Sequence, residues 1–442
     1  MASLEQVLAL LRGKQVVARY RDYYEGRHPL AFATEKFRSA FGSLFREFAY
    51  NLCAAVVDTL ADRLQVTGFA LEDGTDEQAV AAWDIWQANR MDVRAGQVHV
   101  EALRCGNAYV IVWPDADGRP TIYPQQAHQV VVGYDEEQPG SRLWAAKWWR
   151  IADGRVRVNL YTPEAIEKYV TARGGEGALP ERESALVPWP EEPVVENPWG
   201  VVPVVELAND LDIHGHGTSE LRDVIPLQNA LNKQICDLLV AMEYVALPQR
   251  WATGLEVELD PATGKPRAPF VPGVDRMWAV GDPEARFGEF SPADLTQMLA
   301  VVAEFELKVA RVCGIPPHYL SLVTEPPSGE ALKTLEARFV KRVLDRQVVF
   351  GNAWEDALAL ALRMAGYGEA RLSCQWQDPA PVSTREAAET ATLQVQAGVP
   401  RRQVLRELGY SELQIERMLA EDEAGAKELS DRLLAAFDRG EQ

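Results

Sequence analysis

The stretch that decides the fold is residues 291–364, which read SPADLTQMLAVVAEFELKVARVCGIPPHYLSLVTEPPSGEALKTLEARFVKRVLDRQVVFGNAWEDALALALRM. Its first part predicts a helix over 291–313. The opening Ser291-Pro292-Ala293-Asp294 offers a capping hydroxyl, a proline at the first helical position and an acid at the positive end of the dipole. Apolar residues then recur at 3.6-residue spacing until Gly314 and the following proline pair end the pattern.

A second helix follows a loop from His318 to Pro327, which ends in another proline pair. Ser328 can cap this helix, and its apolar stripe continues to Leu362 for about ten turns, or roughly 50 Å. Helices in globular proteins average about 11–12 residues, so this length predicts a strut in a large assembly. A long core helix kinked near Gly351 is the alternative, and the spacing fits both.

Another long helix is predicted before this stretch, over Thr218–Leu247, interrupted early by Pro226. Pro248 ends its apolar stripe. The residues up to 290 are rich in glycine and proline, with short apolar runs between them, which is typical of strands and loops. Helix, small insert and helix together predict a hairpin of two struts with a knob at its tip.

The N-terminal half combines helices with strands. Helical spacing covers Leu4–Tyr24, Glu35–Leu64, Asp76–Asn89 and Val93–Arg104. From Gly106 onward, short apolar runs alternate with turns at hairpin spacing and predict an antiparallel meander. Its strands are expected at 108–113, 120–123, 130–132, 143–150 and 156–161.

Three further segments complete the fold prediction. Arg173–Pro198, rich in Gly, Pro and Glu, is expected to be an exposed loop. Ala370–Trp376 is a candidate strand. Helical spacing returns over Ser383–Ala397, Arg401–Leu408, Ser411–Glu423 and Ala426–Phe437, and Ser383 opens a capping-box pattern. The chain is therefore expected to be α+β and mainly helical.

Composition limits the classes of function. The 442 residues allow two to four domains, and no apolar run is long enough to cross a membrane. No secretion signal is expected at the N-terminus. The five cysteines are odd in number and far apart, which favours buried free thiols in a reducing cytoplasm over disulfide or metal binding.

The net charge of −20 argues against tight binding of nucleic acid. A protein that holds DNA firmly neutralises phosphates with Lys and Arg. An acidic surface can still line a path along which DNA slides, and simple solubility explains the same charge.

Motifs of common enzymes are absent from the sequence. It contains no P-loop, Rossmann fingerprint, nucleophile elbow or H-E-x-x-H zinc motif, and no cofactor is expected. The nearest candidate is a loop in which Asp210, Asp212, His214 and His216 could bind a metal. A polar loop ahead of a helix explains the same residues, so His214 and His216 are weak metal candidates.

The loop between the two helices of the opening stretch is longer than most helix connectors. Its His318, Tyr319 and Glu325 are therefore candidate functional residues. Basic residues on the following helix could contact phosphate or form salt bridges with neighbouring acids, and the salt bridges are slightly favoured. They are Lys333, Arg338, Lys341, Arg342 and Arg346.

Several short motifs resemble the portal proteins of tailed bacteriophages, the head–tail connector family of long-tailed phages. They occur in that family's order over residues 20 to about 365. The stretches are DYYEGRHP (22–29), Asn51 with DRLQVTGF (62–69), PLQNALNK (226–233), Tyr244 with LPQRWATG (247–254), GIPPHYL (314–320) and PSGEALK (327–333). After Ser383 the resemblance is limited to helical character.

The resemblance implies the parts of a portal subunit. They are a wing (1–217), a first stem helix (218–247), a clip (248–290), a second stem helix (291–313), a tunnel loop (314–328), a long wing helix with a strand (329–382) and a helical crown (383–442). The family forms a ring, normally of twelve subunits, around a channel for double-stranded DNA. The ring sits at a capsid vertex of the virion, after assembly in the host cytoplasm.

The resemblance also implies partners and sites, with no catalytic residue, metal or membrane. Terminase large subunit would dock on the clip, and a head-completion or adaptor protein would later replace it; scaffolding and major capsid proteins would contact the ring. Expected channel-facing residues are Tyr319, Leu320, Ser321, Leu322, Val323, Thr324, Glu325 and Ser328. Expected docking residues are Gly254, Asp260, Lys265, Arg267, Asp275 and Arg276.

Two other hypotheses come from different classes. One is a metal-dependent hydrolase that uses Asp210, Asp212, His214 and His216. The other is a ring-forming scaffold that does not belong to a virus. The portal hypothesis is preferred, because the ordered motifs and the hairpin with a knob support it independently.

Overall fold

The computed structural model of the chain describes residues 3–29, 31–41, 50–138, 140–173, 177–213, 215–246, 250–253, 284, 286–289, 294–320, 329–380, 384–408, 410 and 414–422. The α-helices run over Leu4–Gly13 (α1), Ala18–Tyr24 (α2), Glu35–Phe41 (α3), Leu52–Ala61 (α4), Asp76–Ala88 (α5), Met91–Cys105 (α6), Val224–Ala246 (α7), Thr296–Cys313 (α8), Gly329–Met364 (α9), Thr384–Gln396 (α10) and Arg401–Glu407 (α11). The fold is α+β and mainly helical, as the sequence predicts.

The strands form four antiparallel groups. Two-stranded ribbons join β1 (Val66–Asp73) to β13 (Arg371–Trp376) and β11 (Arg250–Thr253) to β12 (Arg286–Glu289). A three-stranded sheet has the order β10 (Val204–Ala208), β2 (Asn107–Pro114), β3 (Pro120–Gln125). The largest sheet has the order β4 (Val130–Tyr134), β5 (Arg142–Arg150), β6 (Val156–Tyr161), β7 (Ala165–Thr171), β8 (Leu186–Pro188), and β9 (Val194–Glu196) also pairs with β7.

The five strands predicted between 108 and 161 and the strand predicted at 370–376 are confirmed, but the five strands do not form one meander. The first two, β2 and β3, pair with β10 in a separate sheet, and only β4, β5 and β6 follow one another in the larger sheet. The prediction that Arg173–Pro198 is only a loop is wrong, because β8 and β9 lie within it and add to β7. Both strands have three residues, too short for their alternation to be recognised beside so many glycines and prolines.

Two predicted helix boundaries are also wrong. The pattern over Glu35–Leu64 is not one helix, because Asn51 has an extended backbone and caps α4. Its side-chain oxygen accepts from the backbone N–H groups of Cys53 and Ala54 at 3.1 and 3.4 Å. The helix predicted from Thr218 begins only at Val224, and Pro226 lies in its first turn, where a missing N–H costs little.

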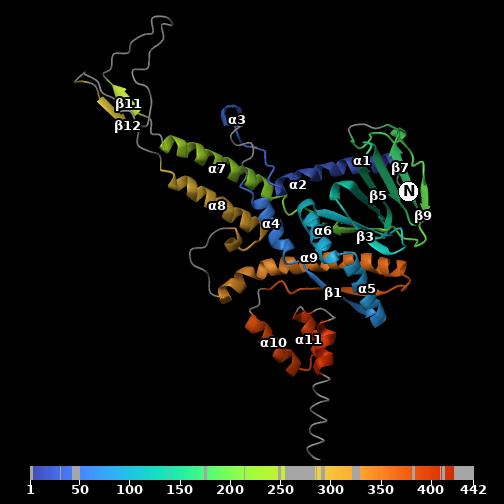
Figure 1. Cartoon of the computed structure of the whole chain (residues 1–442). Helices are drawn as coiled ribbons and strands as arrows, with labels where there is room; N and C mark the ends of the chain where they lie inside the picture. Colours follow the sequence, from blue (N-terminus) through green and yellow to red (C-terminus); the bar gives the residue numbers. More distant parts are fainter. Residues whose placement is uncertain are drawn as a thin grey trace, which may run out of the picture.

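The helix pair matches the predicted hairpin, and of the predicted knob the structure describes the β11–β12 ribbon. Helices α7 and α8 lie side by side, project away from the rest of the chain and carry the β11–β12 ribbon toward their far end (Figure 1). A third helix boundary is wrong as well, because the helix predicted from Ser291 begins only at Thr296, so Ser291 does not cap it. The Asp294 side chain instead accepts from the backbone N–H of Thr296 at 2.9 Å. Residues 383 and 426–437 lie outside the described part of the chain, so the cap predicted at Ser383 and the helix predicted over Ala426–Phe437 stay predictions.

The long helix α9 crosses the middle of the molecule (Figure 1) and runs unbroken from Gly329 to Met364, 36 residues or about 54 Å. No break in the helix occurs at Gly351. A Cβ at that position would lie 3.2 Å from Nε1 of Trp376 on β13. Gly351 therefore allows the β1–β13 ribbon to pack closely on α9.

One large apolar core surrounds α9. Its buried face, with Phe339, Phe350 and Trp354, packs against α4, α5, α6 and the three-stranded sheet. Smaller apolar clusters lie in the strand-rich part. All five cysteines are free and four are buried, as predicted. None of the helices in the described part of the chain is long and apolar enough to cross a membrane.

Candidate functional site where the helix pair meets the long helix

The predicted channel loop starts at the end of α8, where Gly314 adopts a left-handed φ of +63°. Pro317–Tyr319 forms one turn of 3-10 helix, and α9 begins at Gly329. The structure describes Tyr319 and Leu320 and places both against the main core. The other predicted channel residues lie outside the described part: Ser321, Leu322, Val323, Thr324, Glu325 and Ser328.

A buried carboxylate, Glu336 on α9, anchors the start of this loop. The Tyr319 hydroxyl donates to its Oε1 at 2.8 Å, and His318 Nε2 lies 3.5 Å from the same oxygen. Arg63 Nη2 lies 3.2 Å from Oε2. The Arg63 guanidinium also donates to the Tyr319 hydroxyl and to the carbonyl of Pro379. We call these five residues the Glu336 cluster.

The Glu336 cluster joins four segments that are far apart in sequence. Arg63 follows α4, Tyr319 precedes the loop, Glu336 lies on α9, and Pro379 leads toward the C-terminal helices. Glu336 is only 3% exposed, so losing its arginine would leave a buried charge unpaired, at a cost of about 3–5 kcal/mol. Burial, then the bond to Glu336, raises the pKa of Tyr319 to about 12, which keeps its hydroxyl protonated as a donor.

A second buried acid, Glu220, binds the arginines of α9. Arg342 Nη2 lies 2.5 Å from Glu220 Oε2, and Arg346 Nη2 lies 3.0 Å from Oε1. On the exposed side of the helix, Lys341 pairs with Asp345. Lys341, Arg342 and Arg346 thus form salt bridges with acidic residues. The sequence analysis slightly favoured this role over contact with phosphate.

The described members of the loop proposed for metal binding, Asp210, Asp212 and His216, make other polar contacts. The carboxylate of Asp210 lies 3.3 Å from Arg346, and Asp212 accepts from the backbone N–H of His216 at 2.9 Å. Within the described residues, which exclude His214, no group of three or more His, Cys, Asp or Glu could hold a metal ion. The loop is therefore a hydrogen-bonded turn, and the interpretation as a polar loop ahead of a helix is the better one.

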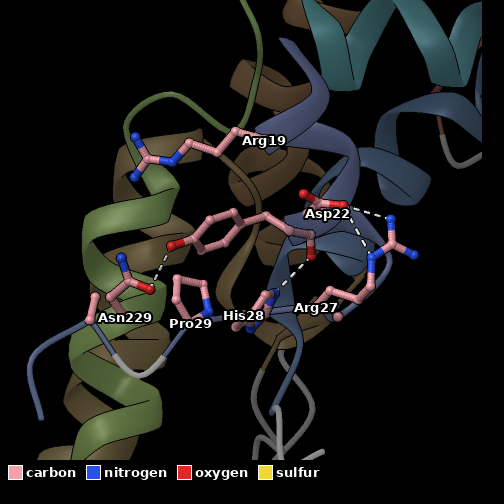
Figure 2. A pocket seen from close by; sticks show the side chains of 9 residues that line it. Arg19, Asp22, Arg27, His28, Pro29 and Asn229 are labelled. Atoms are coloured by element: carbon pink, nitrogen blue, oxygen red, sulfur yellow. Dashed lines mark hydrogen bonds and ion pairs between the residues drawn. The ribbon is translucent and has the colours of Figure 1, made fainter. Parts of the chain in front are cut away.

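Side-chain amides of PLQNALNK lock the DYYEGRHP segment to the first turns of α7 (Figure 2). The Tyr23 hydroxyl donates to Asn229 Oδ1 at 2.8 Å, and Asn232 Nδ2 lies 2.8 Å from His28 Nδ1. The other ring nitrogen of His28 lies 2.7 Å from the Tyr23 carbonyl oxygen. Burial lowers the pKa of His28, consistent with a neutral ring between one donor and one acceptor.

The same helix face holds the start of α4. Gln228 Oε1 accepts from the N–H of Leu52 at 2.9 Å, and its Nε2 donates to the carbonyl of Tyr50 at 2.5 Å. Three of the motifs quoted above, around residues 22–29, 51 and 226–233, therefore meet in one buried network. Its role is to fix the helix pair to the rest of the subunit. A pocket of about 720 Å³, rimmed by Arg19 and Arg27, opens beside it (Figure 2).

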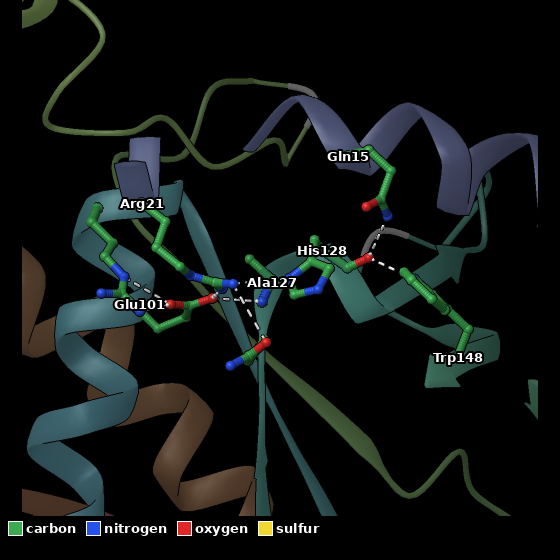
Figure 3. A network of polar contacts seen from close by, with 8 residues as sticks. Gln15, Arg21, Glu101, Ala127, His128 and Trp148 are labelled. Carbon is green, nitrogen blue, oxygen red and sulfur yellow. Dashed lines mark hydrogen bonds and ion pairs between the residues drawn. The ribbon is translucent and has the colours of Figure 1, made fainter. Parts of the chain in front are cut away.

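A third buried acid, Glu101 on α6, was missed by the sequence analysis (Figure 3). Its carboxylate contacts Arg21 at 2.7 Å and Arg104 at 2.7 Å and accepts from the N–H of Ala127 at 2.8 Å. Burial by itself raises the pKa of Glu101, but Arg104, the Ala127 amide and Arg21 together lower it below its ordinary value. The network ties α2 and α6 to the turn before β4.

One signal in the sequence could have identified two of these acids. Glu336 follows Leu332 by one turn and precedes Phe339, and Glu101 lies between Val98 and Ala102. Both are charged residues within an apolar helical stripe, which are rarely buried unless paired. Their partners come from other segments, so the stripe alone could not name them.

The predicted docking residues of the clip lie outside the described part of the chain: Gly254, Asp260, Lys265, Arg267, Asp275 and Arg276. Nearby, the structure describes β11 and β12, which place Trp251 opposite Gly288. Docking at these six positions stays a prediction.

Comparisons with known proteins agree with this architecture. A family model described as "Phage portal protein, SPP1 Gp6-like" matches residues 12–428. The portal protein of Mycobacterium phage D29 is 30% identical over 404 residues, covering 84% of this chain and 78% of that protein. The portal protein of Mycobacterium phage L5 is 29% identical over 405 residues, with the same coverage.

Among solved structures, the chain is similar to one from the virion of a native gene transfer agent particle, with a TM-score of 0.48, 12% identity, and coverage of 78% of this chain and 85% of that one. It is also similar to one from the neck of an empty particle of that agent, with a TM-score of 0.45, 12% identity, and coverage of 83% and 89%. The match of the family model to nearly the whole sequence decides the assignment, and this chain belongs to the SPP1 Gp6-like family of phage portal proteins.

Proposed function

We propose that this protein is one subunit of a portal ring that conducts double-stranded DNA through a capsid vertex during packaging and ejection. The observation that carries the proposal is the family match over residues 12–428. The projecting helix pair with a strand ribbon at its tip and the anchored loop before α9 support it (Figure 1). The family is structural, so the protein is not an enzyme, and the metal-dependent hydrolase is not favoured.

Each part of a portal subunit would correspond to particular elements of the structure. Helices α7 and α8 would be the stem, the β11–β12 ribbon part of the clip, residues before α7 with α9 and β13 the wing, and α10 and α11 part of the crown. The loop between α8 and α9 would face the channel, with Tyr319 held by the Glu336 cluster and Glu325 repelling DNA. A net charge of −20 per subunit would keep contacts with phosphates weak.

The partners are proposed on the same basis. The resemblance to the family implies a ring of about twelve copies. Head-to-tail contacts between identical subunits form a closed ring when the rotation from one subunit to the next divides a full turn. Terminase large subunit would bind the clip from outside, followed by a head-completion or adaptor protein. Scaffolding and major capsid proteins would surround the wing. The ring would reside in the virion, after a period in the host cytoplasm during assembly.

Native mass spectrometry and electron microscopy of the purified protein test the ring. A closed ring of about twelve subunits is expected. A stable monomer at working concentration would contradict the proposal.

Deletion of Val323–Pro326 tests the channel loop. Rings should still assemble, because the Glu336 cluster lies outside the deletion, but packaging or retention of DNA should fall. His216→Gln, at a largely exposed side chain far from the loop in sequence, is the control and should leave packaging unchanged. Normal packaging and retention after the first deletion would make the loop a simple connector.

A further inference from the structure

A cleft of about 650 Å³ opens in the strand-rich part of the molecule. Its lining comes from β2 and β3 of the three-stranded sheet and from β5, β6 and β7 of the larger sheet, so it lies between the two sheets. None of the predicted channel or docking residues lines it.

The floor of the cleft is a row of three side chains across the larger sheet. Asn159 on β6 is paired with Lys147 on β5 and with Lys168 on β7, so the two lysines flank the amide on one face. Tyr161, two residues along the strand, shares that face. Aromatic rings of Trp113, Tyr123 and Trp149 also line the cleft.

Three polar groups on this face, Asn159, Tyr161 and Lys147, have unused hydrogen-bonding capacity. Asn159 is 8% exposed and its Oδ1 has no partner, while its Nδ2 reaches only the Tyr161 hydroxyl at 3.5 Å. Within the described residues, the Tyr161 hydroxyl donates to nothing and the Lys147 ammonium makes no hydrogen bond, although it lies 4.7 Å from the centre of the Trp149 ring. Buried polar groups are nearly always paired, so these groups point to a ligand.

We propose that this cleft binds an extended peptide segment of another protein, one that carries a carboxylate. A peptide group has one N–H donor and one C=O acceptor, which complement Asn159 Oδ1 and the Tyr161 hydroxyl. Lys147 flanks that point and would pair with an acidic side chain, whereas Lys168 on the other side is already paired with Glu192. Grooves lined by aromatic rings bind one kind of extended peptide, the polyproline-II segment, in several peptide-binding domains.

The lining disfavours nucleic acid. Asp115 and Glu192 also line the cleft, and Glu192 is paired with Lys168 at 2.5 Å. A phosphate backbone would approach both carboxylates on a chain that is already strongly acidic. A carbohydrate could use the aromatic rings but would leave the Lys147 ammonium without an anion. Peptide binding requires neither a ring nor DNA, so the proposal does not depend on the channel.

Selection of random peptides displayed on a library, with the full-length protein as the target, tests the proposal. Enriched sequences should share an acidic residue, and a synthetic peptide of that consensus should change the tryptophan fluorescence in a saturable way. Asn159→Leu should weaken its binding about tenfold, the effect of one hydrogen bond to a buried group. Lys147→Met should weaken it most at low salt, since it removes an ion pair.

Trp189→Ala is the matched control. The Arg157 guanidinium lies 4.1 Å from the centre of the Trp189 ring and 5.1 Å from the centre of the Trp149 ring. Trp149 lines the cleft but Trp189 does not, so loss of Trp189 should leave peptide affinity unchanged. Thermal unfolding shows whether each variant is folded, and Lys147→Met tests the cleft even if Asn159→Leu is destabilised. Equal binding by wild type and Lys147→Met, no enrichment of acidic peptides, or saturable binding of maltohexaose or decathymidylate instead would overturn the proposal.

Discussion

At the scale of single residues, the Glu336 cluster joins four distant segments of the chain through one buried carboxylate. Glu336→Gln would leave Arg63 buried without its counter-ion, so the free energy of unfolding should fall by about 3 kcal/mol. The urea midpoint of the purified protein measures this loss. Asp345→Asn on the same helix removes an exposed pair with Lys341 and should change stability by at most about 0.5 kcal/mol. Equal effects of the two variants would contradict the assignment.

A second prediction at this scale concerns pH. Burial lowers the pKa of His99 to about 3, and Trp354 Nε1 donates to its Nε2 at 2.9 Å, which requires a neutral nitrogen. An unfolded chain would bind a proton near pH 6.5, so between pH 6.5 and 3 the unfolded state binds more protons. Stability should therefore fall by about 1.4 kcal/mol per pH unit as pH is lowered through this window.

The variant His99→Gln tests whether His99 causes this loss of stability at low pH. Because the variant cannot take up this proton, its stability gap to the wild type should narrow as the pH falls from 6.5 to 4. Val98→Ala, a buried neighbour of His99 that carries no titratable group, serves as the control and should keep a constant gap. A constant gap for His99→Gln would show that other groups cause the acid sensitivity.

At the scale of elements, two glycines should respond in opposite ways to alanine. Gly217 packs against the turn between α6 and β2, where a Cβ would lie 2.0 Å from the carbonyl oxygen of Gly106. Gly217→Ala should therefore shift the backbone and cost more than 2 kcal/mol, roughly the upper part of the usual range for one substitution. Gly96 lies within α6 with open space around it, so Gly96→Ala should add about 0.5–1 kcal/mol. Melting temperatures of both variants measure the two effects, and a shared sign would contradict the close approach.

At the scale of the whole molecule, charge should control assembly. Each subunit carries a net charge of −20, so neighbouring subunits in a ring repel one another. Raising salt from about 0.05 to 0.5 M shortens the Debye length from more than 10 Å to less than 8 Å and should favour the ring. Analytical ultracentrifugation across this range measures the shift. Dissociation of the ring by salt would instead indicate an interface held by ion pairs.

Much of the fold could be predicted from local patterns. The helices α5 and α6, the strands β4–β6 and the paired helices α7 and α8 all follow from apolar spacing and turn residues, which act over a few positions. The predicted helix boundaries were wrong where a capping side chain started a new helix inside a stretch of helical spacing. Asn51 is an example, because its side-chain oxygen caps the start of α4 within the stretch predicted as one helix. The three-residue strands β8 and β9 were missed because their pairing with β7 is what defines them.

The sequence by itself determined the class of the protein. The ordered motifs predict a phage portal subunit, and the family match over residues 12–428 confirms it, because the order of motifs is a property of the chain alone. The acidic net charge is compatible with that class but does not identify it. Only the tertiary structure decided what the motif residues do. Asn229 and Asn232 on α7 hydrogen-bond to Tyr23 and His28. Arg63 and Tyr319 both hydrogen-bond to the carboxylate of Glu336. These pairs form because buried polar groups need partners, and the fold decides which segments lie close enough to supply them. The cleft around Asn159 likewise exists only where two sheets meet.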